Sequence, residues 1–332
     1  MSSDLQAWEP RLRELCVELR RAARSAAREG LGAVQRPVAE GAGDVTYALD
    51  AATEEALGRW LERTARRCPL SLFSEDAGWR HRGPEGGGTG TRELTGFDHG
   101  GPRIVVDPVD GTRNLMADLR SAWTVVAAAP PGTEQPRLSE VELGLVAELP
   151  DSRAARYRLL SARLGAGARI EERRLEDDFP VHRGALVADT DDRPDHGYFS
   201  IFRYTPAQRP ALAELEARFF ARLAEREGAD LRHCFDDQYI SNGGQLALLS
   251  LGTYRMVADL RAHLAEGSPT PVTTSKPYDC AGAVLVAREA GCVVTDPGGE
   301  VLDFPLDATT PVSFVGWANA ATARRLAPHL LP

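Results

Sequence analysis

The apolar residues near the start of the chain follow a helical period. Leucine or tryptophan at positions 5, 8, 12, 15 and 19 forms a single stripe, which predicts a helix that ends near Gly30. A second helix is predicted over 50–66, with Leu57, Trp60 and Leu61 on its inner side. The arginines on the outer faces of these helices are expected to be solvated.

Strand-like runs dominate the next part of the chain. Short apolar segments are separated by turns, and a glycine-rich stretch among them is expected to be a hairpin tip. The runs are LSLF, RIVVD, WTVVAAA, VELGLVAEL and YRLLSA. Because no long helix interrupts them, an antiparallel sheet is predicted for this half.

Helices and strands alternate from about Ala185 onward. Helical spacing predicts helices over 206–226 and 320–326, and a further helix in YDCAGAVLVAREAG that ends at Gly291. Strands are predicted in GALVAD, YRMVADL, GCVVTD and SFVGWA, with a short helix in GGQLALLSLG. The pattern therefore predicts an α+β first half over 1–180 and a mixed α/β second half over 181–332.

Composition narrows the class of protein. The 332 residues are 43% hydrophobic, enough for a substantial core, and carry a formal net charge of −9. That charge argues against a nucleic-acid partner, and no apolar run approaches the roughly 20 residues that a membrane span needs. The start of the chain lacks a signal-peptide pattern, and its five cysteines are scattered without a C-x-x-C pair. We therefore expect a cytoplasmic globular protein with reduced cysteines and no membrane partner.

The segment RIVVDPVDGTRNL contains the first candidate chemistry, because an apolar strand runs directly into two acids. Pro108 cannot continue a strand ladder, so the strand is predicted to end at Asp107 and to turn Asp107 and Asp110 toward one point. Clustered carboxylates repel one another unless a cation neutralises them, and oxygen ligands favour Mg²⁺. Gly111 and Thr112 then offer backbone N–H groups to a phosphate. The alternative is an Asx-type turn that caps a helix.

Four motifs, taken in order, resemble those of a known family over residues 46–303. The family is the metal-dependent, lithium-sensitive sugar phosphatases typified by inositol monophosphatase and fructose-1,6-bisphosphatase. The motifs are VTYALDAATEE, SEDAG, DPVDGTRN and KPYDCAGAVLVAREAGCVVTD. The segment ADLRAHL before the last motif is most similar to the bifunctional fructose-bisphosphatase/inositol-phosphatase type. The resemblance implies a layered α-β-α-β-α sandwich with the active site in the cleft between the two halves.

The resemblance also implies a two-metal site. Glu75, Asp107 and the backbone carbonyl of Val109 would hold the first Mg²⁺, and Asp107, Asp110 and Asp279 would hold the second. A third, weaker Mg²⁺ would lie near Glu75. Because Asp107 would bridge the first two ions, the arrangement suits a two-metal in-line displacement. The simpler alternative for Asp279 is a helix cap.

Thr112 and Asp50, beside Glu75, are the catalytic residues that the resemblance implies. Thr112, oriented by Asp50, would polarise the metal-activated water that attacks phosphorus. Gly111 and Thr112 would bind the phosphate group. None of the seven histidines lies in the motifs, which fits a site that needs no histidine base. Asp50 also precedes a predicted helix, so a capping role is its alternative.

Substrate-binding residues are predicted mainly in the second half. SNGGQ falls where the family's substrate loop lies, so Gly243, Gly244 and Gln245 are expected to face the sugar, together with Asp110. Lys276 is the only lysine in the chain and is expected to contact a substrate phosphate or hydroxyl. Its alternative is an ordinary surface position.

The sequence departs from the family pattern at an aromatic and a glycine position. Tyr278 stands where the family has tryptophan, and this change is expected to leave metal binding undisturbed. Cys292 replaces the second glycine of a pair, and Cys280 follows Asp279. Both cysteines are expected to be packed side chains and not reactive thiols.

Together these observations predict a Mg²⁺-dependent phosphatase that hydrolyses a small sugar or polyol phosphate monoester, of the inositol monophosphate or fructose 1,6-bisphosphate type. A homodimer is expected because family members are commonly dimers, although nothing in the sequence indicates an interface. One alternative is a 3′(2′),5′-bisphosphate nucleotidase, and the lack of an aromatic platform near the substrate motifs argues against it. The other is a catalytically weak regulatory or binding member of the family, against which the complete set of acids argues.

Overall fold

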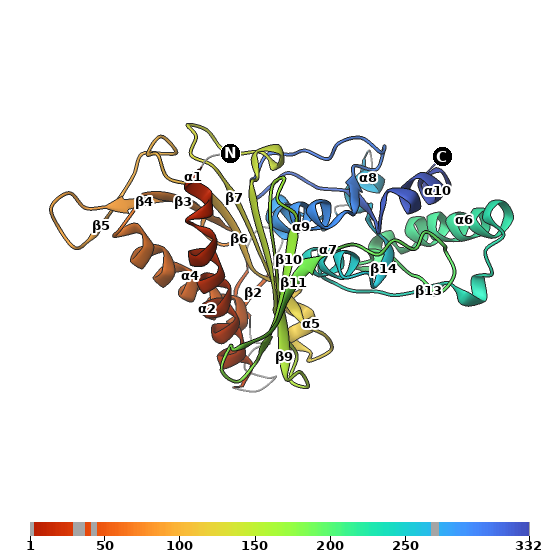
Figure 1. Cartoon of the computed structure of the whole chain (residues 1–332), viewed down its shortest axis with the longest axis horizontal. Helices are drawn as coiled ribbons and strands as arrows, with labels where there is room; N and C mark the ends of the chain where they lie inside the picture. Colours follow the sequence, from red (N-terminus) through yellow and green to blue (C-terminus); the bar gives the residue numbers. More distant parts are fainter. Residues whose placement is uncertain (1–2, 29–36, 41–44, 267–271, 332) are drawn as a thin grey trace.

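The computed structural model describes residues 3–28, 37–40, 45–266 and 272–331 and arranges them in layers of helix and sheet (Figure 1). The largest layer is a nine-stranded sheet with the strand order β11-β10-β9-β8-β7-β6-β3-β4-β5. Its neighbours are antiparallel except β3 and β6, which are parallel. The strands are β3 (Leu70–Ser74), β4 (Gly78–Pro84), β5 (Thr91–Glu93), β6 (Arg103–Asp110), β7 (Ala122–Ala129), β8 (Leu143–Leu149), β9 (Arg156–Arg163), β10 (Ala168–Arg174) and β11 (Pro180–Leu186).

Two helices near the N-terminus cover one face of this sheet. α2 (Glu9–Ala27) and α4 (Ala48–Ala65) pack their leucines against alternate residues of the central strands, such as the fully buried Ile104. The predicted first helix is interrupted, because α1 (Ser3–Gln6) ends before α2 begins and Pro10 occupies the first turn of α2. Proline is tolerated there because the first turn of a helix leaves its N–H groups unpaired.

The middle layer consists of α7 (Asn242–Ser250) and α9 (Pro277–Ala290), which lie between the two sheets. They pack against the opposite face of the nine-stranded sheet, through alternate strand residues such as Val105. α9 approaches β7 closely, since a Cβ atom at Gly282 would lie 2.1 Å from the carbonyl oxygen of Val126. This glycine therefore brings α9 within reach of the acids on β6.

A five-stranded sheet and two outer helices complete the layers. The strand order is β13-β12-β14-β16-β15, with parallel and antiparallel pairs. α6 (Arg209–Glu227) and α10 (Ala320–Leu330) cover its outer face, where Phe219 and Trp317 are buried. The strands are β12 (Tyr198–Ile201), β13 (Phe235–Asp236), β14 (Tyr254–Asp259), β15 (Val293–Thr295) and β16 (Phe314–Trp317). The predicted layered α-β-α-β-α sandwich, antiparallel in the first half and mixed in the second, is confirmed with the one parallel pair as an exception.

The prediction that the strand ends at Asp107 is wrong. β6 runs on to Asp110 with a β-bulge, because Asp107 pairs with Val125 whereas Asp110 pairs with Trp123. The bulge adds one residue to β6 relative to β7. Because side chains alternate between the faces of a strand, this extra residue puts Asp110 on the same face as Asp107. Pro108 lies at the irregular step, where a missing N–H costs no ladder hydrogen bond.

Several other predictions can be compared with the structure. The glycine-rich stretch forms the β4–β5 hairpin, the five cysteines are free, and Gly291 ends α9 with a left-handed φ of 105°. β10 and β12 are not predicted by the sequence pattern, and the predicted strand in GALVAD belongs to β11, an edge of the first sheet, and not to the second half. The division at 180/181 stays a prediction, and the predicted helix end at Gly30 lies outside the described residues.

The remaining elements are short connections. They are β1 (Pro37–Glu40), β2 (Val45–Tyr47), α5 (Thr112–Met116), α8 (Arg261–Ala265) and 3₁₀ turns at Leu138–Glu140, Pro206–Gln208 and Leu231–His233. In the part of the chain that the structure describes, none of the helices has both the length and the apolar surface to cross a membrane.

Candidate active site

A cavity of about 650 Å³ lies between the nine-stranded sheet and the N-terminal ends of α7 and α9, and five acidic residues line it, Asp76 among them. Glu75 follows β3, Asp107 and Asp110 lie on β6, and Asp279 lies in the first turn of α9. A smaller recess of about 60 Å³ adjoins Glu75 and includes Asp50 in its lining. The fold thus gathers acids that are far apart in the sequence.

Hydrogen bonds hold the β-bulge that carries Asp107. The backbone N–H of Val109 donates to Oδ1 of Asp107 at 2.9 Å. From the neighbouring strand, Oγ1 of Thr124 donates to the carbonyl of Pro108 at 2.8 Å. The buried Asp107 carboxylate is therefore fixed by the strand that bears it.

The acids of the cavity disfavour one another's charge. Burial, followed by the charges of Asp110, Asp279 and Glu75, raises the pKa of Asp107 well above its usual range. Burial raises the pKa of Asp110 to about 6, although its hydrogen bonds oppose the shift. Burial and the charges of Asp110 and Glu75 likewise raise the pKa of Asp279. A cation in the cavity would relieve this excess negative charge.

The N-terminal end of α7 holds Asp110. Oδ2 of Asp110 accepts hydrogen bonds from Oγ of Ser241 and from the backbone N–H of Gly243, both at 2.6 Å. The backbone N–H of Asn242 lies 3.3 Å from Oδ1. Ser241 is also the N-cap of α7, because its Oγ accepts from the N–H of Gly244 at 2.9 Å. The SNGGQ segment therefore positions an acid of the cavity.

The structure differs from the sequence prediction for the substrate residues of this segment. Gly243, Gly244 and Gln245 are buried, and Gln245 is fully covered. Ser241 and Asn242 form the cavity wall at this point instead. The predicted residues stand behind the wall and support it, and their contact with a substrate stays a prediction.

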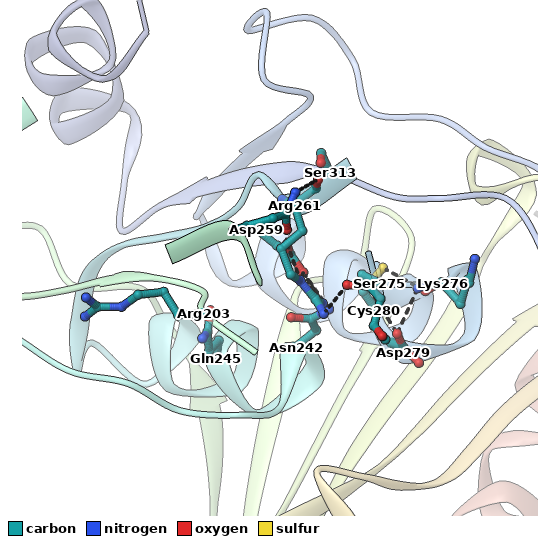
Figure 2. Close-up of polar contacts among 12 residues, drawn as sticks. Arg203, Asn242, Gln245, Asp259, Arg261, Ser275, Lys276, Asp279, Cys280 and Ser313 are labelled. Atoms are coloured by element: carbon teal, nitrogen blue, oxygen red, sulfur yellow. Dashed lines mark hydrogen bonds and ion pairs between the residues drawn. The ribbon is translucent and has the colours of Figure 1, made fainter. Parts of the chain in front are cut away.

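Asp279 uses one of its oxygens to cap α9 (Figure 2). Its Oδ2 accepts a hydrogen bond from the backbone N–H of Lys276 at 2.8 Å and lies 3.3 Å from Oγ of Ser275. A carboxylate has a second oxygen, so capping and ligation are compatible functions of this residue. The capping alternative is thus present in the structure without excluding the metal role.

Arginine and aromatic side chains line another part of the cavity. Arg261 forms a buried ion pair with Asp259 at 2.6 Å, and its guanidinium carbon lies 4.2 Å and 5.4 Å from the ring centroids of Phe202 and Tyr204 (Figure 2 shows the ion pair). The guanidinium carbon of Arg113 lies 5.0 Å from the Tyr204 centroid. The two rings follow β12, which no motif marks, and this explains why the sequence indicated no aromatic platform near the substrate motifs.

Lys276 also lines the cavity, but its ammonium group already has one contact in the protein. Nζ donates a hydrogen bond to the carbonyl of Thr309 at 2.9 Å. An ammonium group has three N–H donors, so this contact does not exhaust it. The predicted contact of Lys276 with a substrate stays a prediction.

The hydroxyl of Thr112 lies between two acceptors. Oγ1 is 2.9 Å from Oδ1 of Asp50 and 2.9 Å from the carbonyl of Val109. Oδ2 of Asp50 accepts from the backbone N–H of Tyr47 at 3.0 Å, so Asp50 caps α4 and also contacts Thr112. A hydroxyl has one proton and two lone pairs. With its proton directed to either acceptor, Thr112 can still accept a hydrogen bond from a water molecule.

Gly111 makes the turn from β6 into α5. Its φ of 93° is left-handed, and a Cβ atom would lie 2.8 Å from the carbonyl oxygen of Ile240. Only glycine fits this turn without strain. Asn114 fixes the same turn, because its side-chain amide donates to the carbonyl of Ile240 at 2.6 Å.

The chemistry of the lining residues fits a hard divalent cation. Four carboxylates and the Val109 carbonyl offer oxygen ligands, which Mg²⁺ prefers. Among the described residues, no three acidic, histidine or cysteine side chains are already arranged to hold an ion. The assignment of Glu75, Asp107, Asp110 and Asp279 as ligands therefore stays a prediction, supported by their shared cavity and mutual repulsion.

A five-layered sandwich with an acid-lined cavity between its sheets is the architecture expected of the family that the sequence resembles. The chain belongs to the inositol monophosphatase family, whose model matches residues 12–330. A fructose-1,6-bisphosphatase/inositol-1-monophosphatase of Methanothermobacter thermautotrophicus is 26% identical over 279 residues, covering 83% of this chain and 80% of that protein.

Several solved structures share the fold. The extragenic suppressor protein suhB of Bartonella henselae aligns with a TM-score of 0.61 and 17% identity, over 96% of this chain and 97% of that one. Inositol monophosphatase-II of Staphylococcus aureus, with bound 2′AMP, aligns with a TM-score of 0.60 and 17% identity, over 98% and 94%. The same protein has been solved with bound inositol monophosphate.

Proposed function

We propose that this protein is a Mg²⁺-dependent phosphatase that hydrolyses a small sugar or polyol phosphate monoester. The observation that carries the proposal is the gathering of Glu75, Asp107, Asp110 and Asp279 on one cavity, beside the Thr112–Asp50 pair. Family membership supports it, because the curated relative is named for phosphatase activity on fructose 1,6-bisphosphate and inositol 1-phosphate.

Each acid has a distinct proposed role. Asp107, at the bulge, would bridge two cations, because the charges of Asp110, Asp279 and Glu75 all act on its carboxylate. Glu75 and the Val109 carbonyl would complete one site, and Asp110 and Asp279 the other. A third and weaker ion would use the recess beside Glu75. When bound, the cations would supply a water of lowered pKa and stabilise the leaving alkoxide.

Thr112 and Asp50 would accept the proton that the attacking water loses. The Thr112 hydroxyl donates toward Asp50, and its lone pairs remain to accept a proton from water as the oxygen attacks phosphorus. The backbone N–H groups of Gly111 and Thr112 would hold the phosphate in line with this attack. Asp110 would also contact a substrate hydroxyl.

Phosphate release tests the proposal directly. Purified protein is incubated with inositol monophosphates, sugar phosphates and nucleotides, with Mg²⁺ present or removed by chelation and with or without lithium. We expect Mg²⁺-dependent, lithium-inhibited release from a sugar or polyol phosphate, and its loss in Asp107→Asn with the fold intact. Asp303→Asn is the matched control, since Asp303 is an acid bound to Arg137 outside the cavity. Full activity of Asp107→Asn would refute the proposal that Asp107 bridges two cations.

A nucleotidase remains the second candidate, and the structure favours it more than the sequence did. Phe202 and Tyr204 line the cavity, and the Staphylococcus aureus relative has been solved with bound 2′AMP. Release of phosphate from adenosine 3′,5′-bisphosphate, but not from sugar phosphates, would establish this function. If no compound in the panel releases phosphate, the regulatory or binding role is favoured.

The assembly and location of the protein are further parts of the proposal. Because the sequence resemblance implies a dimer, we infer a homodimer in the cytoplasm that acts on a small phosphate ester without nucleic acid or membrane. Mass measurement by light scattering tests the dimer, and a single chain in solution would contradict it.

A further inference from the structure

A tyrosine from the second half of the chain contacts a proposed metal ligand of the first half. The hydroxyl of Tyr278 donates a hydrogen bond to Oε1 of Glu75 at 2.9 Å, across 203 positions of sequence. From the sequence, the change from tryptophan to tyrosine at position 278 is expected to leave metal binding undisturbed. The hydroxyl of Tyr278 is an O–H donor. Tryptophan, the family residue at this position, would offer an indole N–H at a different place on its ring.

Tyr278 is itself rigidly placed. It lies in the first turn of α9, is 7% exposed, and its ring centroid lies 5.9 Å from that of Phe73 on β3. Phe73 in turn contacts Trp79 with a centroid distance of 5.5 Å. The ring is thus held by packing while its hydroxyl reaches the residue that follows β3.

Glu75 has a longer side chain than the three aspartates, and it is exposed at the end of β3, whereas Asp107 and Asp110 are buried. Ordering a glutamate side chain is entropically unfavourable. A fixed hydroxyl that holds the carboxylate before the ion arrives lowers that cost at the moment of binding.

We propose that Tyr278 is a positioning residue that strengthens divalent-cation binding by holding Glu75 toward the cavity. The inference rests on the proposed function, because it assumes that Glu75 binds a cation. Tyr278 touches no substrate in this account and acts only through Glu75.

Calorimetric titration with Mn²⁺, in the absence of substrate, tests the inference on wild type, Tyr278→Phe and Tyr254→Phe. Tyr254→Phe is the matched control, because the buried Tyr254 hydroxyl donates to Asp237 at 2.6 Å in a part of the protein that does not line the cavity. We expect Tyr278→Phe to weaken Mn²⁺ binding at the site that includes Glu75 roughly tenfold, and Tyr254→Phe to bind Mn²⁺ as wild type does. The Mg²⁺ concentration for half-maximal activity should rise similarly, with kcat at saturating Mg²⁺ within about twofold of wild type.

The outcomes separate the inference from the proposed function. If wild type binds no Mn²⁺, the metal site itself is refuted. If wild type binds and Tyr278→Phe binds equally well, only the role of Tyr278 is refuted. Should Tyr278→Phe fail to fold, Tyr278→Leu, whose side chain also has no hydrogen-bond donor, replaces it in the titration.

A second background checks that Tyr278 acts through Glu75. Glu75→Asp shortens the side chain by one carbon and withdraws the carboxylate from the hydroxyl. Tyr278→Phe should therefore weaken Mn²⁺ binding no further in the Glu75→Asp protein. If Tyr278→Phe lowers the Mn²⁺ affinity equally in the wild-type and the Glu75→Asp protein, Tyr278 does not act through Glu75.

Discussion

The most quantitative consequence of the structure concerns Asp110, whose substitution should make the metal-free protein more stable. Burial raises the pKa of Asp110 from 3.8 to about 6 even though Ser241 and Gly243 donate hydrogen bonds that favour the charged form. The shift is therefore a net cost of ionising this carboxylate inside the cavity. Asp110→Asn removes the charge and keeps an oxygen that can accept the Gly243 hydrogen bond.

The magnitude and the pH window follow from linkage. An acid whose pKa is higher when folded binds its proton more tightly in the folded state, so stability falls as pH rises from 3.8 through about 6 and stays lowered above that. A shift of about two pKa units corresponds to about 3 kcal/mol. At pH 8 and without metal, Asp110→Asn should therefore gain up to about 3 kcal/mol and several degrees in Tm. The gain should shrink as pH falls toward 4.

Thermal unfolding with a chelator present and with saturating Mg²⁺ measures both parts of this prediction. Metal that binds only the folded state stabilises it according to its affinity, so Mg²⁺ should raise the Tm of wild type more than that of Asp110→Asn. The reasoning would be refuted if metal-free Asp110→Asn were no more stable than wild type at pH 8, or if the difference did not change with pH.

Three further predictions test the other parts of the site. Thr112→Ala should lower kcat by about 10²–10⁴-fold while Thr112→Ser stays within about tenfold of wild type, because serine keeps the hydroxyl beside Asp50; equal activity of both variants in a phosphate-release assay would contradict this role. Gly111→Ala should destabilise the fold by about 2 kcal/mol or more in denaturant unfolding, since the position has a φ of 93° and no space for a Cβ atom, and an unchanged midpoint would show that the turn adapts. Lys276→Ala should raise KM for the substrate severalfold, and unchanged kcat and KM would restrict this lysine to its contact with Thr309.

The sequence indicated acids that the structure brings to one cavity, but it did not predict the strand geometry that brings them together. The motif acids could be chosen because carboxylates beside a strand end and a Gly-Thr turn suggest a metal and a phosphate. The bulge that aligns Asp107 with Asp110 depends on how β6 pairs with β7, and a single strand's pattern does not contain that register. The predicted strand therefore ended at Asp107, before the bulge, whereas β6 continues to Asp110.

Long-range contacts were outside the reach of the motifs. The hydrogen bond from Tyr278 to Glu75 and the one from Ser241, the N-cap of α7, to Asp110 each join residues more than a hundred positions apart. Phe202 and Tyr204 reach the cavity from a segment with no recognisable signature. Periodicity predicted most of the helices and strands, because each buries one face. The layered arrangement of these elements was expected from the resemblance to the family and not from periodicity.

Binding of Mn²⁺ to the wild-type protein and to Asp107→Asn, measured by calorimetry without substrate and followed by anomalous diffraction from soaked crystals, tests the central claim most directly. The account predicts two ions per wild-type chain on either side of the Asp107 carboxylate, and loss of at least one of them in Asp107→Asn. An empty cavity at saturating Mn²⁺, or ions that bind Asp107→Asn and wild type equally, would contradict it.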